Sequence, residues 1–195
     1  MPVQVPVFKR EIMNHMYSPS AYYFARTISG MLVQLIAPIL SFLTIFFGLG
    51  IKITLDSCMH YLGTGLELTL VGCAIGYMCG LMFDDDNAAR GICMFFTLIF
   101  MLVSGGLNNA GTYPPVIKQL QYVSPNRYAT ELYFRVFSDF QKYPEYLFHQ
   151  ITEDEILQLV GLTKGYQVCH LALLGIFVMF YMLGWLAITV RNRKF

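Results

Sequence analysis

Charged side chains are scarce in this chain of 195 residues, and their scarcity excludes an ordinary soluble domain. Asp, Glu, Lys and Arg make up 13% of the residues and hydrophobic residues 56%, whereas soluble domains have about 25% and roughly 45–50%. The mean hydropathy of +0.53 agrees with this imbalance. A net charge of +1 gives no sign of nucleic-acid binding. The composition therefore indicates an integral membrane protein.

Motifs that carry catalysis are also absent. The chain has no G-x-x-x-x-G-K-[S/T] loop to hold phosphates, no H-E-x-x-H and no nucleophile elbow. Its five cysteines show no C-x-x-C spacing, so neither a zinc site nor a redox pair is indicated. The acidic run 84–87 (DDDN) could bind a divalent cation, but the start of a helix explains it better. We expect no catalytic residue, metal or cofactor in this chain.

Long apolar stretches are present instead, and they predict an all-α helical bundle in a membrane. A bilayer takes about 20 mostly apolar residues per crossing helix. The third stretch is free of charge to 107, and 108–111 could continue it. We predict four membrane spans, at 28–51, 57–83, 91–109 and 166–190.

Basic residues near the span ends predict the orientation. An even number of spans puts both termini on one side, and that side carries Lys9, Arg10, Arg26 and Arg90 together with the basic tail 191–194. Because short cytoplasmic segments are enriched in Lys and Arg, we expect both termini in the cytoplasm. The start of the chain also lacks the basic and apolar pattern of a cleaved signal peptide.

Two segments are neither spans nor ordinary loops. Residues 8–25 mix apolar and charged side chains in the way an interfacial helix does, with a break or cap near Ser18-Pro19. The outer loop 110–165 contains two stretches with helical spacing, 116–123 and 127–140. We expect these two to form short helices at, or dipping into, the outer interface.

A polar stripe runs along the second predicted span. His60, Thr64 and Glu67 recur at i, i+4 and i+7, so they share one helix face. Glu67 lies about 15 Å along the helix at 1.5 Å per residue, where a carboxylate costs on the order of 3 kcal/mol. It is either part of a polar relay or substrate-facing wall, or a packed glutamate, ionised or protonated, that is bonded to a neighbouring span.

Small and apolar residues mark two further helix faces. Gly72, Gly76 and Gly80 form a small-xxx-small strip that lets another helix, from this chain or a second subunit, approach closely. Leu98 and Met101 lie on one apolar face of the third span, which suits a permissive cavity or plain packing.

Four ordered strings resemble the membrane domain of White-type (G subfamily) ATP-binding cassette transporters. Residues 6–11 (PVFKRE) and 17–23 (YSPSAYY) resemble the segment before the family's third membrane helix, and Pro38 matches a proline within that helix. Residues 104–109 (SGGLNN) resemble the outer end of the fifth helix. Residues 120–128 (LQYVSPNRY), followed by Glu131, resemble the family's S-P-x-R-Y-x-x-E segment.

The resemblance implies a partial transporter membrane domain over 1–195, with membrane helices three to six. The segment 8–25 corresponds to the coupling helix, which implies that Phe8, Arg10, Glu11 and Tyr17 receive motion from a nucleotide-binding domain. That domain, with its ATP and magnesium, and the first two membrane helices are missing, as in a fragment or a truncated product. The family dimerises around a cavity partly lined by the fifth helix, which makes candidate cavity and gate residues of Leu98, Met101, Gly106 and Leu107.

The sequence also departs from the family pattern. The double-leucine plug of the family corresponds to Gly106-Leu107, so one plug residue is absent. No cysteine lies between 108 and 165, so the outer-loop disulfides of some members cannot form.

The first functional hypothesis is the translocation pathway of an ATP-driven exporter in a plasma or organelle membrane, carrying sterols, phospholipids, pigment precursors or xenobiotics. A second is a non-transporting subunit or remnant that binds and regulates a full-length half-transporter. A small channel or carrier would need a continuous polar path, and only the Glu67 stripe offers one. An inverted repeat would support a carrier, and none is visible.

Overall fold

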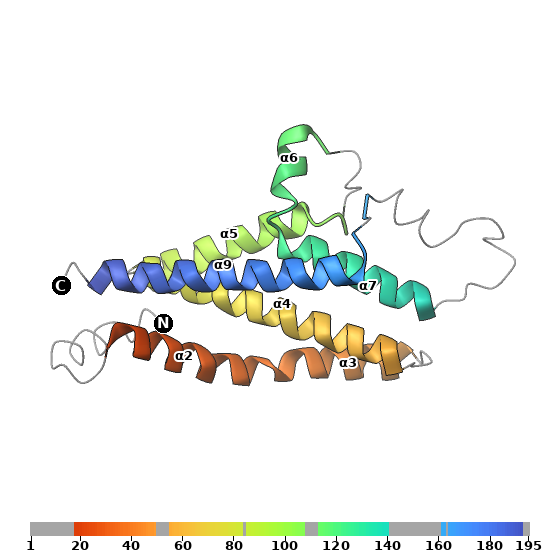
Figure 1. Cartoon of the computed structure of the whole chain (residues 1–195), viewed down its shortest axis with the longest axis horizontal. Coiled ribbons are helices and arrows are strands. Elements are labelled where there is room, and N and C mark those ends of the chain that lie inside the picture. The colour runs from red at the N-terminus through yellow and green to blue at the C-terminus, as the bar shows by residue number, and fades with distance from the viewer. Residues whose placement is uncertain are drawn as a thin grey trace, which may run out of the picture.

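The computed structural model describes residues 18–49, 55–83, 85–107, 113–140, 161–162 and 164–192. The described residues form helices joined by turns and contain no strand, which confirms the predicted all-α class (Figure 1). The long helices lie side by side, and α6 stands apart from them (Figure 1). The helices are α2 (Pro19–Gln34), α3 (Ile36–Leu49), α4 (Leu55–Met82), α5 (Asp86–Leu102), α6 (Pro115–Leu120), α7 (Pro125–Phe140) and α9 (Tyr166–Asn192).

Helix α2 starts where the sequence supplies both a cap and a helix-compatible proline. The Ser18 hydroxyl accepts a 3.2 Å hydrogen bond from the backbone N–H of Ala21, and Pro19 occupies the first turn, where no N–H is needed. The predicted cap at Ser18-Pro19 is therefore present. The structure differs in having no break between 25 and 28, so 19–25 belong to the first long helix. The remainder of the predicted coupling helix, 8–17, lies outside the described residues.

The first long helix is interrupted once. Helix α2 ends at Gln34, Leu35 forms a turn, and α3 begins at Ile36. Pro38 explains the position because it has no N–H to donate to Gln34, and its ring crowds the carbonyl four residues earlier. The helix is thus interrupted about one turn before Pro38, in the span where a kink was expected.

Helix α4 is the centre of the bundle, packing most extensively on α9 and also on α7, α5, α2 and α3. A hydrophobic core cluster joins α4, α5, α7 and α9, with Leu132 and Leu173 completely buried. Burying a leucine-sized side chain contributes about 1.5–3 kcal/mol. This core fixes α7 against the two long helices, so the helix expected at 127–140 packs into the bundle.

Helix α5 starts earlier and ends sooner than the predicted span 91–109. The Asp85 side chain caps it by accepting hydrogen bonds from the N–H groups of Asn87 and Ala88, which confirms the helix-start interpretation of the acidic run. It ends at Leu102, and Gly105 follows with φ +85°, a left-handed conformation that favours glycine. Its 17 residues extend about 25 Å, against a hydrocarbon core of about 30 Å.

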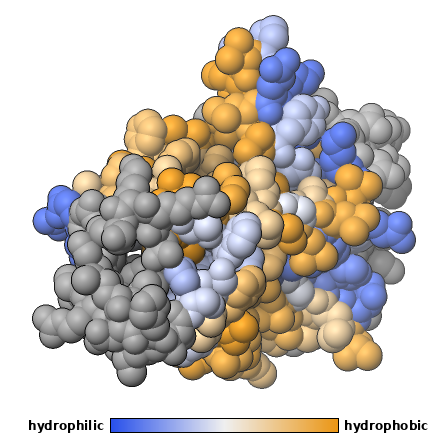
Figure 2. Space-filling model, turned by 60° about the vertical axis from the view of Figure 1, so that its left-hand side comes forward, coloured by the Kyte–Doolittle hydropathy of each residue, from blue (hydrophilic) through white to orange (hydrophobic). Residues whose placement is uncertain are grey.

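Three helical segments are long and apolar enough to cross a bilayer, namely Pro19–Gly48, Leu55–Met82 and Tyr166–Val190. Of the four predicted spans, three therefore correspond to helices of spanning length, and the one around α5 to a shorter helix. Orange, hydrophobic side chains cover much of the face in Figure 2, with blue gathered at its margins. Many large apolar side chains are exposed along these helices, among them Val33, Phe47 and Leu171. A lipid environment accounts for that exposure, and the chain is an integral membrane protein.

Candidate functional site

The predicted polar stripe on α4 contacts α9 through a histidine that the sequence interpretation did not select. Glu67 Oε2 lies 2.8 Å from Nδ1 of His170. The other ring nitrogen of His170, Nε2, lies 3.4 Å from Nδ1 of His60. Two helices thus bring two imidazoles and a carboxylate into one connected group.

The environment of this group is partly enclosed. The side chains of Glu67 and His170 are 18% and 22% exposed, and the ring of His60 stacks on Tyr166 at a centroid distance of 4.4 Å. Thr64 does not join, because its hydroxyl donates a 2.7 Å hydrogen bond to the His60 carbonyl within α4. Glu67 is therefore bonded to a neighbouring span, an arrangement that fits both alternatives drawn from the sequence.

His170 could have been identified from the sequence because it stands alone among apolar residues. Within 166–190 it is the only residue among the Asp, Glu, Lys, Arg and His types. An ionisable side chain in an apolar span usually faces a polar partner, so Glu67 and His170 could have been paired from the sequence.

A pocket of about 320 Å³ lies where the end of α5 meets α7. Three of the predicted cavity and gate residues line it, Met101, Gly106 and Leu107, whereas Leu98 lies one turn earlier on α5 and does not. The remaining lining residues are Leu68, Ser104, Asn126, Ala129, Thr130 and Tyr133. A few polar groups on a mostly apolar wall are typical of sites for small hydrophobic molecules.

Hydrogen bonds hold the walls of this pocket together. We name it the outer pocket because its residues within 104–107 follow the end of α5 that is predicted to face outward. The Ser104 hydroxyl donates to the Met101 carbonyl at 2.7 Å and accepts from the N–H of Gly106 at 3.2 Å, which fixes the turn after α5. The Ser124 hydroxyl donates to the Phe100 carbonyl at 2.8 Å and ties the start of α7 to α5. Burial raises the pKa of Tyr133, on the α7 wall of the pocket, to about 12.

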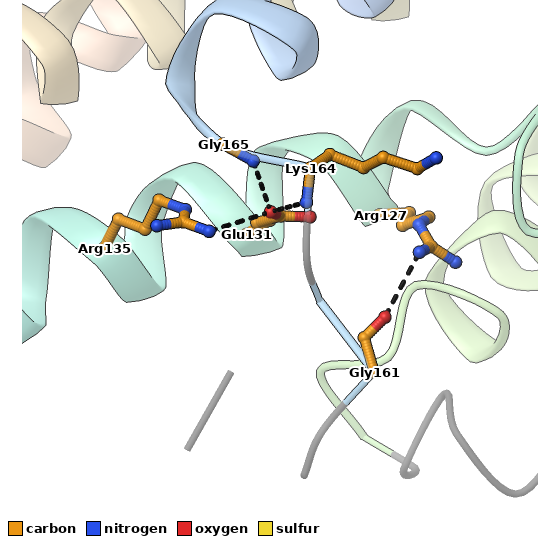
Figure 3. Close-up of polar contacts among 6 residues, drawn as sticks. All are labelled: Arg127, Glu131, Arg135, Gly161, Lys164 and Gly165. Atoms are coloured by element: carbon orange, nitrogen blue, oxygen red, sulfur yellow. Dashed lines mark hydrogen bonds and ion pairs between the residues drawn. The ribbon is translucent and has the colours of Figure 1, made fainter. Parts of the chain in front are cut away.

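A buried carboxylate joins α7 to the start of α9 (Figure 3). Glu131 is 0% exposed, and its Oε1 accepts hydrogen bonds from the backbone N–H groups of Lys164 (2.5 Å) and Gly165 (2.9 Å) and from the guanidinium of Arg135 (3.3 Å). Arg127 donates to the Gly161 carbonyl at 3.2 Å. Glu131 supplies the acceptor and the negative charge that the N-terminus of a helix favours.

The glycine strip of α4 borders a groove of about 640 Å³ instead of a closely packed helix. Gly72, Gly76 and Gly80 all line the groove, with residues of α2, α3 and α5 on its other sides. A Cβ built on Gly72 or Gly76 would meet nothing within 4 Å. The close helix approach predicted for this strip is therefore not made among the described residues at these two glycines.

The predicted coupling residues Phe8, Arg10, Glu11 and Tyr17 lie outside the described residues. Within the described ranges, no group of three or more His, Cys, Asp or Glu side chains is arranged to hold a metal ion.

Family models identify the class of the chain. Residues 1–137 match the family described as ABC-2 type transporter. This match covers well over half of the chain, and the chain belongs to that family of transporter membrane domains.

Individual relatives are White-type and G-subfamily transporters, which confirms the resemblance predicted from the four strings. The chain is 26% identical over 128 residues to "Protein white" of Ceratitis capitata, covering 66% of this chain and 19% of that protein. It is 30% identical over 132 residues to "ABC transporter G family member 21" of Arabidopsis thaliana, covering 67% of this chain and 19% of that protein. It is 21% identical over 191 residues to "ABC transporter ATP-binding protein/permease wht-3" of Caenorhabditis elegans, covering 97% and 31%. The chain thus spans between a fifth and a third of the length of these relatives.

Proposed function

We propose that the chain forms part of the translocation pathway of an ATP-driven G-subfamily exporter that moves lipids, sterols or other hydrophobic small molecules. Membership of the ABC-2 type transporter family supports this function, as does similarity to a protein named as a combined ATP-binding protein and permease. ATP and magnesium bind at a nucleotide-binding domain outside this chain. In this proposal the chain forms the path for the transported molecule, and its partner domain hydrolyses ATP.

The observation that carries the proposal is the outer pocket between α5 and α7. Met101 and Leu107 present apolar walls, while Asn126 and Thr130 from α7 supply polar groups at the same place. A hydrophobic molecule with one polar end matches that lining. The pocket is only about 320 Å³, the lower end of the range for ligand sites, so it suits one small molecule or a lipid segment in transit.

The orientation fits an alternating mechanism. The first residues of α2 and the last residues of α9 lie at the same end of the bundle, and α7 runs from the middle of the bundle toward the opposite end (Figure 1). Residues of α7 line the outer pocket. We place the former end in the cytoplasm, with the segment containing Arg10 and Glu11 receiving motion from the nucleotide-binding domain. Two copies, or one copy and another half-transporter, enclose the cavity. ATP-driven closure of the motor then opens the cavity toward the outer pocket.

The test is ATP-dependent movement of a fluorescent phospholipid or sterol analogue in vesicles holding the chain and its nucleotide-binding partner. Met101→Trp, which fills the outer pocket, should lower the rate at least fivefold. The matched variant Leu171→Trp places the same bulk on an exposed apolar position of α9 and should leave the rate unchanged. Equal rates in the wild type and Met101→Trp contradict the proposed pathway. A stable complex that moves no lipid in any variant favours the regulatory-subunit hypothesis.

A further inference from the structure

Four ionisable side chains follow one another from the exposed start of α4 into the bundle. Asp56 Oδ1 lies 3.9 Å from Nε2 of His60, His60 Nδ1 lies 3.4 Å from Nε2 of His170, and His170 Nδ1 lies 2.8 Å from Oε2 of Glu67. Both nitrogens of each imidazole therefore face the next group in the series. Asp56 and Glu67 are eleven residues apart, about 16 Å along a helix.

Exposure falls along the same series. The Asp56 side chain is 82% exposed and that of His60 31%, whereas His170 and Glu67 are 22% and 18% exposed. The outermost group is thus open to the surroundings, and the innermost group, Glu67, contacts an imidazole. A histidine passes a proton by accepting on one nitrogen and releasing from the other.

The surroundings supply few competing charges. Helix α9 contributes Tyr166, stacked on His60, and α7 contributes Arg135 and Glu131, which pair with each other. The Arg135 guanidinium lies 5.9 Å from the centre of the Tyr166 ring, and Tyr133 of α7 contacts Tyr61 on a neighbouring part of α4. Helix α3 has no titratable side chain. The charged residues of α2 and α5 are Arg26, Asp86 and Arg90. The first part of α2 and the first part of α5 lie toward the end of the bundle opposite to the start of α4 (Figure 1).

We propose that Asp56, His60, His170 and Glu67 form a proton path that connects one membrane surface to a proton-binding carboxylate at Glu67. This inference rests on the residues of α4 and α9 alone and does not depend on the proposed transport function. It assigns the proton as the ligand of the polar stripe. The proton enters from the end of the bundle where α3 ends and α4 begins. Chains of Asp, Glu and His serve as proton relays in other membrane proteins.

The transfer balances without any co-reactant. With Asp56 and both imidazoles neutral and Glu67 ionised, His170 Nδ1–H donates to Glu67, His60 Nδ1–H donates to His170 Nε2, and Asp56 donates to His60 Nε2. Moving each of the three protons across its link makes Glu67 a neutral acid and Asp56 a carboxylate. Both histidines stay neutral, and the proton of each moves from Nδ1 to Nε2. Asp56 then takes a proton from water, and the net change is one proton delivered to Glu67.

In this proposed path the link between Asp56 and His60 is the slowest. The 3.9 Å separation between Asp56 and His60 is longer than a hydrogen bond, so a rotation of the exposed Asp56 side chain or one bridging water completes it. The 3.4 Å link between the imidazoles is long but within hydrogen-bond distance. The path is therefore gated at its outer end, where the side chain is free to move.

The test follows the protonated-carboxyl infrared band of Glu67 after a rapid drop in buffer pH, with the full chain in lipid nanodiscs. The band is assigned by its loss in Glu67→Gln. In the wild type we expect it to grow as the pH falls. His60→Gln keeps a hydrogen-bonding side chain that cannot relay a proton, and it should slow the response at least tenfold. Thr64→Ala, one turn further along α4, should respond at the wild-type rate because Thr64 bonds only within its helix.

Two results overturn the proposal: a wild-type band that does not follow pH, or a His60→Gln response as fast as the wild type. Asp56→Asn provides a second variant, because this exposed position does not contribute to the core. It should also slow the response, and an unchanged rate overturns the assignment of Asp56 as the entry. Circular dichroism on each variant verifies that the helices are intact.

Discussion

The Glu131 carboxylate accepts a 2.9 Å hydrogen bond from the backbone N–H of Gly165, a residue 34 positions further along the chain. Gly165 has φ +77°, a left-handed conformation that side chains rarely adopt. The turn before α9 therefore needs both a glycine to adopt its backbone geometry and a buried acceptor to satisfy its N–H groups. Glu131 in this way fixes where the last membrane helix begins.

Glu131→Ala should destabilise the protein because it leaves the N–H groups of Lys164 and Gly165 and the Arg135 guanidinium without their shared acceptor. Removing one partner of a buried charged group costs about 3–5 kcal/mol. We expect a clearly lower unfolding midpoint in detergent, measured by circular dichroism. Arg90→Gln breaks an exposed pair with Asp86, and its cost should stay below about 1 kcal/mol. Equal midpoints for the two variants contradict the role of Glu131.

Gly184→Ala should weaken the contact between α2 and α9. A Cβ at Gly184 would lie 2.5 Å from the Tyr23 hydroxyl oxygen, which donates a 2.9 Å hydrogen bond to the Tyr181 carbonyl. Overpacking of this kind costs about 1–3 kcal/mol. Gly175→Ala on the same helix meets nothing within 4 Å and should be neutral or stabilising by up to about 1 kcal/mol. Thermal unfolding of the two variants compares them directly.

Gly106→Leu should obstruct the outer pocket and restore a pair of leucines at 106–107. A Cβ at Gly106 would lie 3.3 Å from Cγ2 of Thr130, so the side chain projects toward α7. We expect lipid-stimulated ATP hydrolysis of the assembled transporter to fall several-fold with little change in unfolding temperature. Gly91→Leu adds the same side chain to open space on α5 and should preserve activity. Full activity in Gly106→Leu would contradict the pocket as part of the pathway.

Alkaline pH should destabilise the fold through Tyr133. Burial raises the pKa of Tyr133 to about 12, whereas an unfolded tyrosine ionises near pH 10. The folded state therefore favours the neutral phenol, and its stability contribution is present below about pH 10 and lost as the pH rises through about 12. Tyr133→Phe should lose less stability across this interval than the wild type, and the exposed Tyr122→Phe should lose as much as the wild type. Unfolding midpoints at a series of pH values measure the difference.

Glu67→Ala in a complete transporter should assemble normally but show reduced transport-coupled ATP hydrolysis, since His170 loses the carboxylate that it contacts at 2.8 Å. Glu67→Gln keeps a hydrogen-bond acceptor for His170 and tests whether the charge itself matters. Wild-type turnover in Glu67→Ala would remove this residue from the mechanism.

Most of the helical architecture could be predicted because it follows from local rules. Capping at Ser18 and Asp85, the interruption caused by Pro38 and the placement of 125–140 in a helix all depend on residues close in sequence. The end of α5 was harder to predict from the sequence, because the apolar pattern continues past Leu102. Only Gly105, with its left-handed backbone, marks the turn.

Partners between distant segments were predicted less well than the helices. Met101, Gly106 and Leu107 were selected from a resemblance, and the structure brings them together beside α7. His170 lies 103 residues from Glu67, and Lys164 and Gly165 lie 33 and 34 residues from Glu131. Such pairings depend on how helices pack, which a periodic pattern in one helix does not specify.

The interruption at Leu35 divides the first membrane-crossing segment into two rods with different attachments. Helix α2 is fastened to α9 through Tyr23 and to α4, while α3 rests on α4 through the aromatic cluster of Phe42, Phe46 and Tyr61. A displacement applied at the Pro19 end thus acts first on α2, because the helix is interrupted at Leu35. We expect α2 to tilt together with α9 while α3 stays packed on α4, so motion at one end of this segment need not be reproduced at the other end.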